Sequence, residues 1–138
     1  MTETFSAGEP KKYKILIVED QRPLAEITRM SFPAGQFQAL ACYSGADALK
    51  EVAVHRPDLI VLDLIMPGGI DGWEVLRRLR ADAATASIPV VVCTGKEDPG
   101  DVDRAFQAGA QAYVMKPVHF GLLIKKVAAI LDIEELLK

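Results

Sequence analysis

Short apolar runs alternate along the chain with longer stretches in which apolar residues recur every three or four positions. Three of these runs are continuous rather than alternating, which is typical of strands buried on both faces of a parallel sheet. The second and fifth runs are weaker, so we expect them at the edges of the sheet. In chain order, the predicted strands are Lys14–Val18, Phe37–Cys42, Asp58–Asp63, Ile88–Cys93 and Ala112–Met115.

The stretches between these runs carry signals that start and stop helices. Ser44 precedes Asp47 by three positions, and Asp71 precedes Glu74 in the same way, which is the capping-box pattern. We interpret Trp73, near the start of the third helix, as a packing residue. The predicted helices run from Pro23 to Pro33, from Ser44 to Ala53, from Asp71 to Leu79, from Asp98 to Gly109 and from Phe120 to Leu137.

The strict alternation of five strands and five helices favours right-handed crossovers and a doubly wound parallel sheet. Placing the two weak runs at the edges gives the strand order 2-1-3-4-5, the flavodoxin-like arrangement. The sequence therefore predicts an α/β fold with a five-stranded parallel sheet. In such a sheet, ligands bind at the carboxyl ends of the strands, near the point between strands 1 and 3 where the strand order reverses.

The composition is that of one folded domain, with 138 residues, of which 50% are hydrophobic and 25% are charged. We assign residues 13–138 to this domain and the polar residues 1–12 to a disordered N-terminal tail. The tail lacks the apolar segment of a signal peptide. No apolar run is longer than the five residues of Val127–Leu131, which is too short to span a membrane. Because Cys42 and Cys93 have no metal-binding or redox-motif neighbours, we expect a reducing, cytoplasmic location.

Polar side chains end the central strands at one edge of the predicted sheet. Glu19 and Asp20 follow the first strand, and Asp63 ends the third. Thr94 ends the fourth strand, and Lys116 follows the fifth. Carboxylates in one small pit repel one another, and Mg²⁺, which prefers oxygen ligands, relieves that repulsion. A metal ion, a lysine and a hydroxyl are the groups that phosphoryl transfer needs, and a carboxylate can be the nucleophile. These residues therefore predict a magnesium site that forms an aspartyl-phosphate.

Five short segments surround these positions and form a recognisable set. They are Val18–Asp20, Asp63–Pro67, Asp71–Gly72, Thr94–Gly95 and Tyr113–Pro117. In this order they resemble the receiver domain of bacterial response regulators, of the kind found in single-domain chemotaxis receivers. The resemblance extends over residues 13–137, and the whole set is far more specific than a single short motif.

The resemblance implies a role for each matching residue of the acidic site. Asp63 would accept a phosphoryl group from a phosphohistidine on a partner. Lys116 would pair with Asp63 before the transfer and with the phosphoryl group after it. Asp20 would be the main metal ligand, and Glu19 would act through a metal-bound water. The backbone carbonyl of Ile65 would complete the metal shell.

A second group of residues is implied to read out the phosphorylation. Thr94 would form a hydrogen bond to the phosphoryl group, and the Tyr113 side chain would then move inward. As a result, the face formed by helix 4, strand 5 and helix 5 would change shape. The Lys116–Pro117 peptide bond is implied to be cis. The implied partners are a histidine kinase or histidine phosphotransfer protein as donor and a downstream protein as output. We expect the chain to catalyse only its own phosphorylation and slow dephosphorylation.

Two features depart from the family pattern. The loop Pro67–Gly72 has one residue more than usual, and we expect a glycine with positive φ to absorb it beside an intact site. Ile65 and Lys96 occupy the positions at which the family tunes hydrolysis of the phosphoryl group. Neither side chain can accept a hydrogen bond from an attacking water, so we expect slow self-dephosphorylation.

Other classes of protein fit the site residues less well. The full acceptor set disfavours a degenerate receiver used only for docking. Glu19 and Asp20 would repel the anionic cofactor of a flavodoxin-like electron carrier, and a phosphatase with an aspartyl nucleophile would need an acid in place of Ile65. Because the last helix nearly ends the chain, we expect a single-domain protein without an output domain. The net charge of −3 favours no direct contact with nucleic acid. The sequence leaves open a monomer or a phosphorylation-dependent dimer, and a freestanding chain or a fragment.

Overall fold

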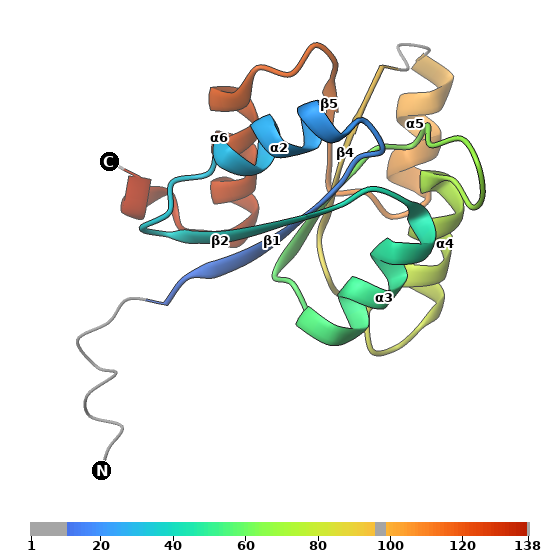
Figure 1. The fold of residues 1–138 in the computed structure, drawn as a ribbon, viewed down its shortest axis with the longest axis horizontal. Coiled ribbons are helices and arrows are strands. Elements are labelled where there is room, and N and C mark those ends of the chain that lie inside the picture. The colour runs from blue at the N-terminus through green and yellow to red at the C-terminus, as the bar shows by residue number, and fades with distance from the viewer. Residues whose placement is uncertain (1–10, 96–98, 138) are drawn as a thin grey trace.

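The computed structural model describes residues 11–95 and 99–137 and shows one parallel sheet between two layers of helices (Figure 1). The strand order is β2-β1-β3-β4-β5, as predicted. Strand ends differ from the predicted ones by at most two residues. In chain order, the elements are β1 (Tyr13–Val18), α2 (Arg22–Met30), β2 (Phe37–Cys42), α3 (Gly45–His55), β3 (Leu59–Leu62), α4 (Gly72–Ala81), β4 (Val90–Thr94), α5 (Pro99–Gln107), β5 (Ala112–Met115), α6 (Phe120–Leu131) and the 3₁₀ helix η1 (Glu134–Leu137).

Each face of the sheet carries its own apolar core. Helices α2 and α6 cover one face, and α3, α4 and α5 cover the other (Figure 1). Because side chains alternate along a strand, β1 sends Leu16 to the α3–α4–α5 side and Ile15 to the α2–α6 side. Ile60 and Val61 of β3 divide in the same way. Burying each such side chain contributes about 1.5–3 kcal/mol, so the two cores fix the central strands.

Two helices begin at the predicted capping residues. The Ser44 hydroxyl accepts a hydrogen bond from the Asp47 backbone N–H at 3.1 Å and starts α3. The Asp71 carboxylate accepts one from the Glu74 N–H at 2.9 Å and starts α4. Such caps contribute about 1 kcal/mol each. The second cap matters for function because it fixes the helix that follows the Asp63 strand.

The prediction of one continuous last helix as far as Leu137 was wrong. Helix α6 ends at Leu131 because Asp132 takes the left-handed conformation, with a φ of 58°. Aspartate tolerates this conformation better than most residues do. The turn buries Ile133, which is 5% exposed, and its N–H bonds to the carbonyl of Ala128. The apolar spacing did not reveal this break because η1 continues it.

Several predictions fall wholly or partly outside the described residues. Of the predicted tail, only Lys11 and Lys12 are described, and both are exposed. Lys96, one of the residues expected to tune dephosphorylation, and the predicted helix cap Asp98 lie in the range 96–98, outside the described residues. Over the described ranges, every helix is too short or too polar to cross a membrane.

Candidate functional site

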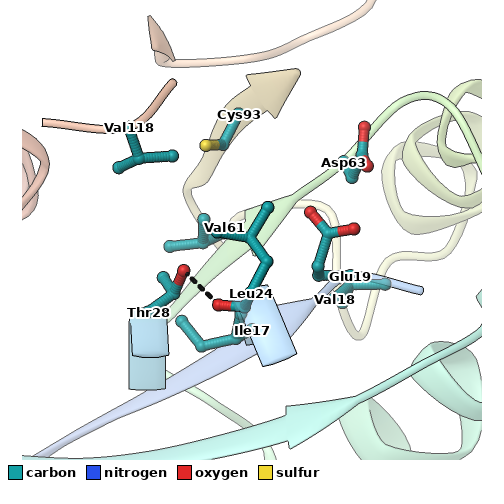
Figure 2. A pocket seen from close by; sticks show the side chains of 9 residues that line it. All are labelled: Ile17, Val18, Glu19, Leu24, Thr28, Val61, Asp63, Cys93 and Val118. Atoms are coloured by element: carbon teal, nitrogen blue, oxygen red, sulfur yellow. Dashed lines mark hydrogen bonds between the residues drawn. The ribbon is translucent and has the colours of Figure 1, made fainter. Parts of the chain in front are cut away.

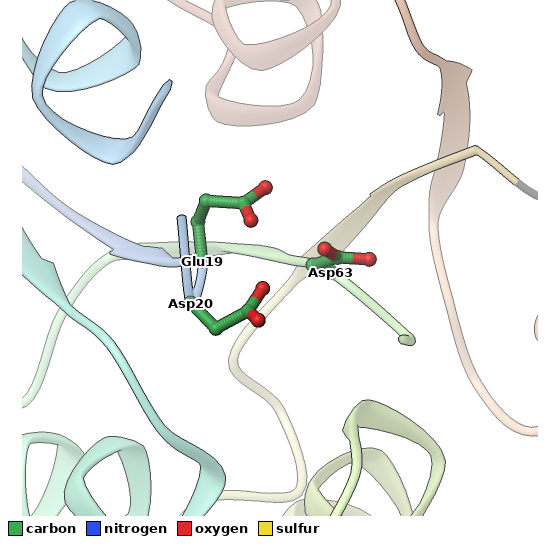
Figure 3. A group of neighbouring side chains, drawn as sticks. All are labelled: Glu19, Asp20 and Asp63. Carbon is green, nitrogen blue, oxygen red and sulfur yellow. The ribbon is translucent and has the colours of Figure 1, made fainter. Parts of the chain in front are cut away.

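Three carboxylates meet at the carboxyl ends of β1 and β3 (Figure 3). One oxygen of each of Glu19, Asp20 and Asp63 lies within 4.8 Å of the other two. Glu19 and Asp63 are buried, with 5% and 4% exposure, whereas Asp20 is half-buried. Val18 of β1 pairs with Leu62 of β3, so the residues that follow the two strands emerge side by side. The predicted acidic pit is therefore formed.

Lys116, from the end of β5, bridges two of the three carboxylates. Its ammonium group donates hydrogen bonds to Oε1 of Glu19 at 2.5 Å and to Oδ2 of Asp63 at 2.9 Å. Burial raises the pKa of Glu19, although the hydrogen bond from Lys116 opposes this effect. Burial also lowers the pKa of Lys116, but its bonds to the two carboxylates outweigh that effect, so the pKa is raised. Lys116 is therefore held as a cation between its two partners.

The side chains around this cluster suit a hard divalent cation. All three candidate ligands are carboxylates, and one lysine cannot neutralise three of them. Mg²⁺ is bound in proteins by a few carboxylates together with several waters. Glu19, Asp20 and Asp63 are the residues that would hold it. The part predicted for the Ile65 carbonyl stays a prediction.

The backbone around Asp63 is fixed on both sides. Its N–H bonds to the carbonyl of Val18 at 3.0 Å, and its Oδ1 accepts a hydrogen bond from the N–H of Ile65 at 3.0 Å. Gly72, at the start of α4, donates its N–H to the carbonyl of Leu64 at 3.1 Å. A Cβ at Gly72 would lie 2.1 Å from the carbonyl oxygen of Asp63, so only glycine fits there. Helix α4 therefore packs directly against the backbone that carries Asp63.

The loop after Asp63 contains glycines with positive φ, as predicted. Gly68 and Gly69 have φ angles of 82° and 141°, in a region that side chains disfavour. Asp63, which precedes this loop, lies within the carboxylate cluster. Ile65, two residues beyond Asp63, is 46% exposed.

An apolar pocket lies behind the two buried carboxylates (Figure 2). Leu24, Val61 and Val118 supply much of its wall beside Glu19 and Asp63. These apolar side chains keep water away from Glu19, which is why burial raises the pKa of its carboxyl group. The nearby Cys93 thiol also lines the pocket, and burial raises its pKa to about 12. Cys93 is therefore part of the core, as its apolar sequence neighbours indicated.

Thr94 has a buried hydroxyl at the same edge of the sheet. It is fully buried, and its Oγ1 has no hydrogen-bond partner among the described residues. Its carbonyl accepts a hydrogen bond from the Lys116 N–H at 3.0 Å, which ties the two strand ends together. A buried hydroxyl without a hydrogen-bond partner costs about 1–3 kcal/mol. A hydrogen-bond acceptor placed within reach of Oγ1 of Thr94 would remove this cost. Tyr113 lies half-buried on β5, and the Lys116–Pro117 bond is cis, as the resemblance implied.

Two arginines that make long-range contacts were not singled out from the sequence. Arg80 of α4 donates to the Gly109 carbonyl, and the Arg104 guanidinium of α5 lies over the Trp73 ring. Trp73 packs against the core, as predicted, but it also carries this cation. Each arginine lies far along the chain from its partner, so local patterns gave no signal for either contact.

The fold and the lysine-bridged acidic cluster define a receiver-type signalling domain. The family model for the response regulator receiver domain matches residues 15–128. The chain therefore belongs to the response regulator receiver domain family. A crystal structure of a putative response regulator from Chloroflexus aurantiacus has a TM-score of 0.82 and 30% identity, and the match covers 88% of this chain and 99% of that one.

Curated relatives place the domain in two-component signalling. "Transcriptional regulatory protein AfsQ1" of Streptomyces coelicolor is 37% identical over 117 residues, which are 85% of this chain and 50% of that protein. "DNA-binding response regulator MtrA" of Mycolicibacterium smegmatis is 38% identical over 118 residues, which are 86% of this chain and 50% of that protein. The chain thus spans about half the length of these relatives. Their names and lengths give no support to the expectations of a single-domain protein and of no direct contact with nucleic acid.

Proposed function

We propose that this receiver domain takes a phosphoryl group onto Asp63 from a phosphohistidine of a histidine kinase or a histidine phosphotransfer protein. The observation that carries the proposal is the bridge from Lys116 to Glu19 and Asp63 within the acidic cluster. An oxygen of Asp63 forms the new bond to phosphorus as the bond from phosphorus to the donor's imidazole nitrogen breaks. The electron pair of that broken bond stays with the imidazole.

The surrounding groups stabilise the charge that the transfer adds. Lys116, already bonded to Oδ2 of Asp63, can move its hydrogen bonds to the phosphoryl oxygens. The Ile65 N–H holds Oδ1 of Asp63 and so fixes the carboxylate plane. The Thr94 hydroxyl gains an acceptor in the phosphoryl group. Mg²⁺ held at the cluster of Glu19, Asp20 and Asp63 would supply positive charge next to the transferring group.

We propose that the face formed by α5, β5 and α6 passes the signal to a downstream protein. These are the fourth helix, fifth strand and fifth helix of the predicted order. Phe106, Met115 and Leu122 lie on this face with 47%, 49% and 46% exposure and line one groove. Grouped exposed apolar side chains mark interaction surfaces. The names of the relatives favour control of transcription as the process that the signal reaches.

We also propose that the phosphorylated state is long-lived and that the chain acts catalytically only on itself. Ile65, exposed beside Asp63, offers no acceptor for a hydrolytic water. The same argument applies to Lys96 from its residue type alone. Ile65→Asn and Lys96→Glu should each speed the decay of phosphorylated protein. If neither variant decays faster than the wild type, the proposal of slow hydrolysis is wrong.

The acceptor role is tested by incubating the protein with acetyl phosphate and Mg²⁺ and measuring its intact mass. The wild type should gain the mass of one phosphoryl group, and Asp63→Asn should gain none. Asp71→Asn is the matched control because Asp71 caps α4 outside the cluster, and it should be phosphorylated like the wild type. Equal phosphorylation of the wild type and Asp63→Asn would contradict the proposal.

A further inference from the structure

Helix α5 is held to the domain by little apolar burial. Among its described side chains, Ala105 is fully buried, Val102 is half-buried and Phe106 is 47% exposed. Because the hydrophobic contribution scales with buried apolar area, one alanine adds little to the docking of the helix. The helix also follows β4, the strand that ends in Thr94. Other contacts must therefore contribute to the position of α5.

One such contact joins α5 to α4. The guanidinium carbon of Arg104 lies 3.8 Å from the centroid of the Trp73 ring, within the range of a cation–π interaction. Trp73 belongs to the first turn of α4 and packs against the core. The preceding Gly72 is packed against the backbone of Asp63 so closely that a Cβ would not fit. The first turn of α4, which carries Trp73, is therefore packed against the backbone of the acceptor residue.

The far end of α5 is held by a different and more extensive contact. Arg80 of α4 donates hydrogen bonds from Nη2 and Nε to the carbonyl of Gly109, at 2.8 and 3.2 Å. It also donates to the carbonyl of Ile88 at 2.8 Å and to Oε1 of Gln111 at 3.1 Å. These bonds fix the turn after α5 to the start of β4 and β5. The single stack at Arg104 is the weaker of the two attachments.

We propose that the Trp73–Arg104 stack is a latch that holds α5 against α4 in the unphosphorylated domain and opens when Asp63 is phosphorylated. The proposal rests on the proposed function. Cation–π attraction needs the cation within about 6 Å of the ring, so a shift of a few ångströms at Arg104 breaks the stack. The turn held by Arg80 stays in place and acts as the pivot. The latch therefore links the acceptor residue to the outer face of the domain.

The latch favours one of two positions of α5, so its removal should change measurable populations. An exposed cation–π contact corresponds to a population ratio of about 2- to 5-fold. Arg104→Ala should therefore be phosphorylated by acetyl phosphate about 2- to 5-fold faster than the wild type. Trp73 is the single tryptophan of the chain, so its fluorescence reports on the stack directly.

The test compares Arg104→Ala with Arg77→Ala in both fluorescence and phosphorylation rate. Arg77 is the matched control because it lies on α4, is 65% exposed and pairs with Glu74. Without phosphate, Arg104→Ala should already show Trp73 emission close to that of the phosphorylated wild type, and Arg77→Ala should match the unphosphorylated wild type. Arg104→Gln, which keeps much of the side chain and loses the charge, should behave like Arg104→Ala.

The outcomes separate the latch from the function on which it rests. A wild type that takes up no phosphoryl group on Asp63 overturns both proposals. If Asp63 is phosphorylated but Arg104→Ala matches the wild type in emission and in rate, the latch alone is wrong. Equal changes in Arg104→Ala and Arg77→Ala would also overturn the latch, because they would reflect only the loss of a surface charge.

Discussion

Replacing Thr94 by valine should stabilise the unphosphorylated domain. The Thr94 hydroxyl is fully buried and bonds to no described residue, and such a group costs about 1–3 kcal/mol. Valine has nearly the same shape and carries no polar atom. Taking the lower end of that range, the free energy of unfolding should rise by about 1 kcal/mol. In urea, where small domains lose about 1–3 kcal/mol per molar, the midpoint should rise by about 0.3–1 M.

Thr28→Val is the matched control for this substitution. Thr28 is also buried, at 4% exposure, but its Oγ1 donates a hydrogen bond to the carbonyl of Leu24 at 2.8 Å. The same change there removes an existing bond and should lower the free energy of unfolding by about 1 kcal/mol. Urea unfolding followed by circular dichroism measures both variants. A loss of stability in Thr94→Val comparable to that in Thr28→Val would refute the reasoning.

Three further predictions follow from single contacts. Gly72→Ala places a Cβ 2.1 Å from the Asp63 carbonyl oxygen, so the free energy of unfolding in urea should fall by about 3 kcal/mol. An unchanged urea midpoint would contradict the close packing. Burial raises the pKa of the Cys42 and Cys93 thiols to about 12, so both should react with a disulfide reagent at pH 8 only in urea; rapid labelling of the native protein would be inconsistent with this burial. Hydrogen bonds from arginines lower the pKa of Glu74 from 4.5 to about 2, so its stabilising effect is present above pH 4.5 and is lost as the pH falls towards 2. Glu74→Gln should lose less stability than the wild type over that pH range, and parallel acid-unfolding curves would show that the effect is absent.

The strands and the topology followed from local patterns, but the last helix did not. Continuous apolar runs are the direct result of burial on both faces, so periodicity identified the central strands and placed the weak runs at the edges. The end of α6 depends instead on Asp132 taking a left-handed conformation so that Ile133 is buried. Tertiary packing therefore determines where α6 ends. The continuing apolar spacing as far as Leu137 concealed it.

The acidic site could be predicted because topology brings strand ends together. Once the strand order was inferred, Glu19, Asp20 and Asp63 had to lie at one edge, and the structure places them there. The bond from Lys116 to Glu19 joins residues 97 positions apart and depends on side-chain reach, which no local pattern encodes. The same is true of the stack of Arg104 on the Trp73 ring.

The central claim is that Asp63 is the acceptor of a histidine-bound phosphoryl group. The most direct measurement is transfer from a phosphorylated histidine kinase in the presence of Mg²⁺, followed by peptide mapping of the modified residue. The account predicts that the phosphoryl group is found on Asp63 and that no transfer occurs to Asp63→Asn. Modification at any other residue, or transfer that persists in Asp63→Asn, would contradict it.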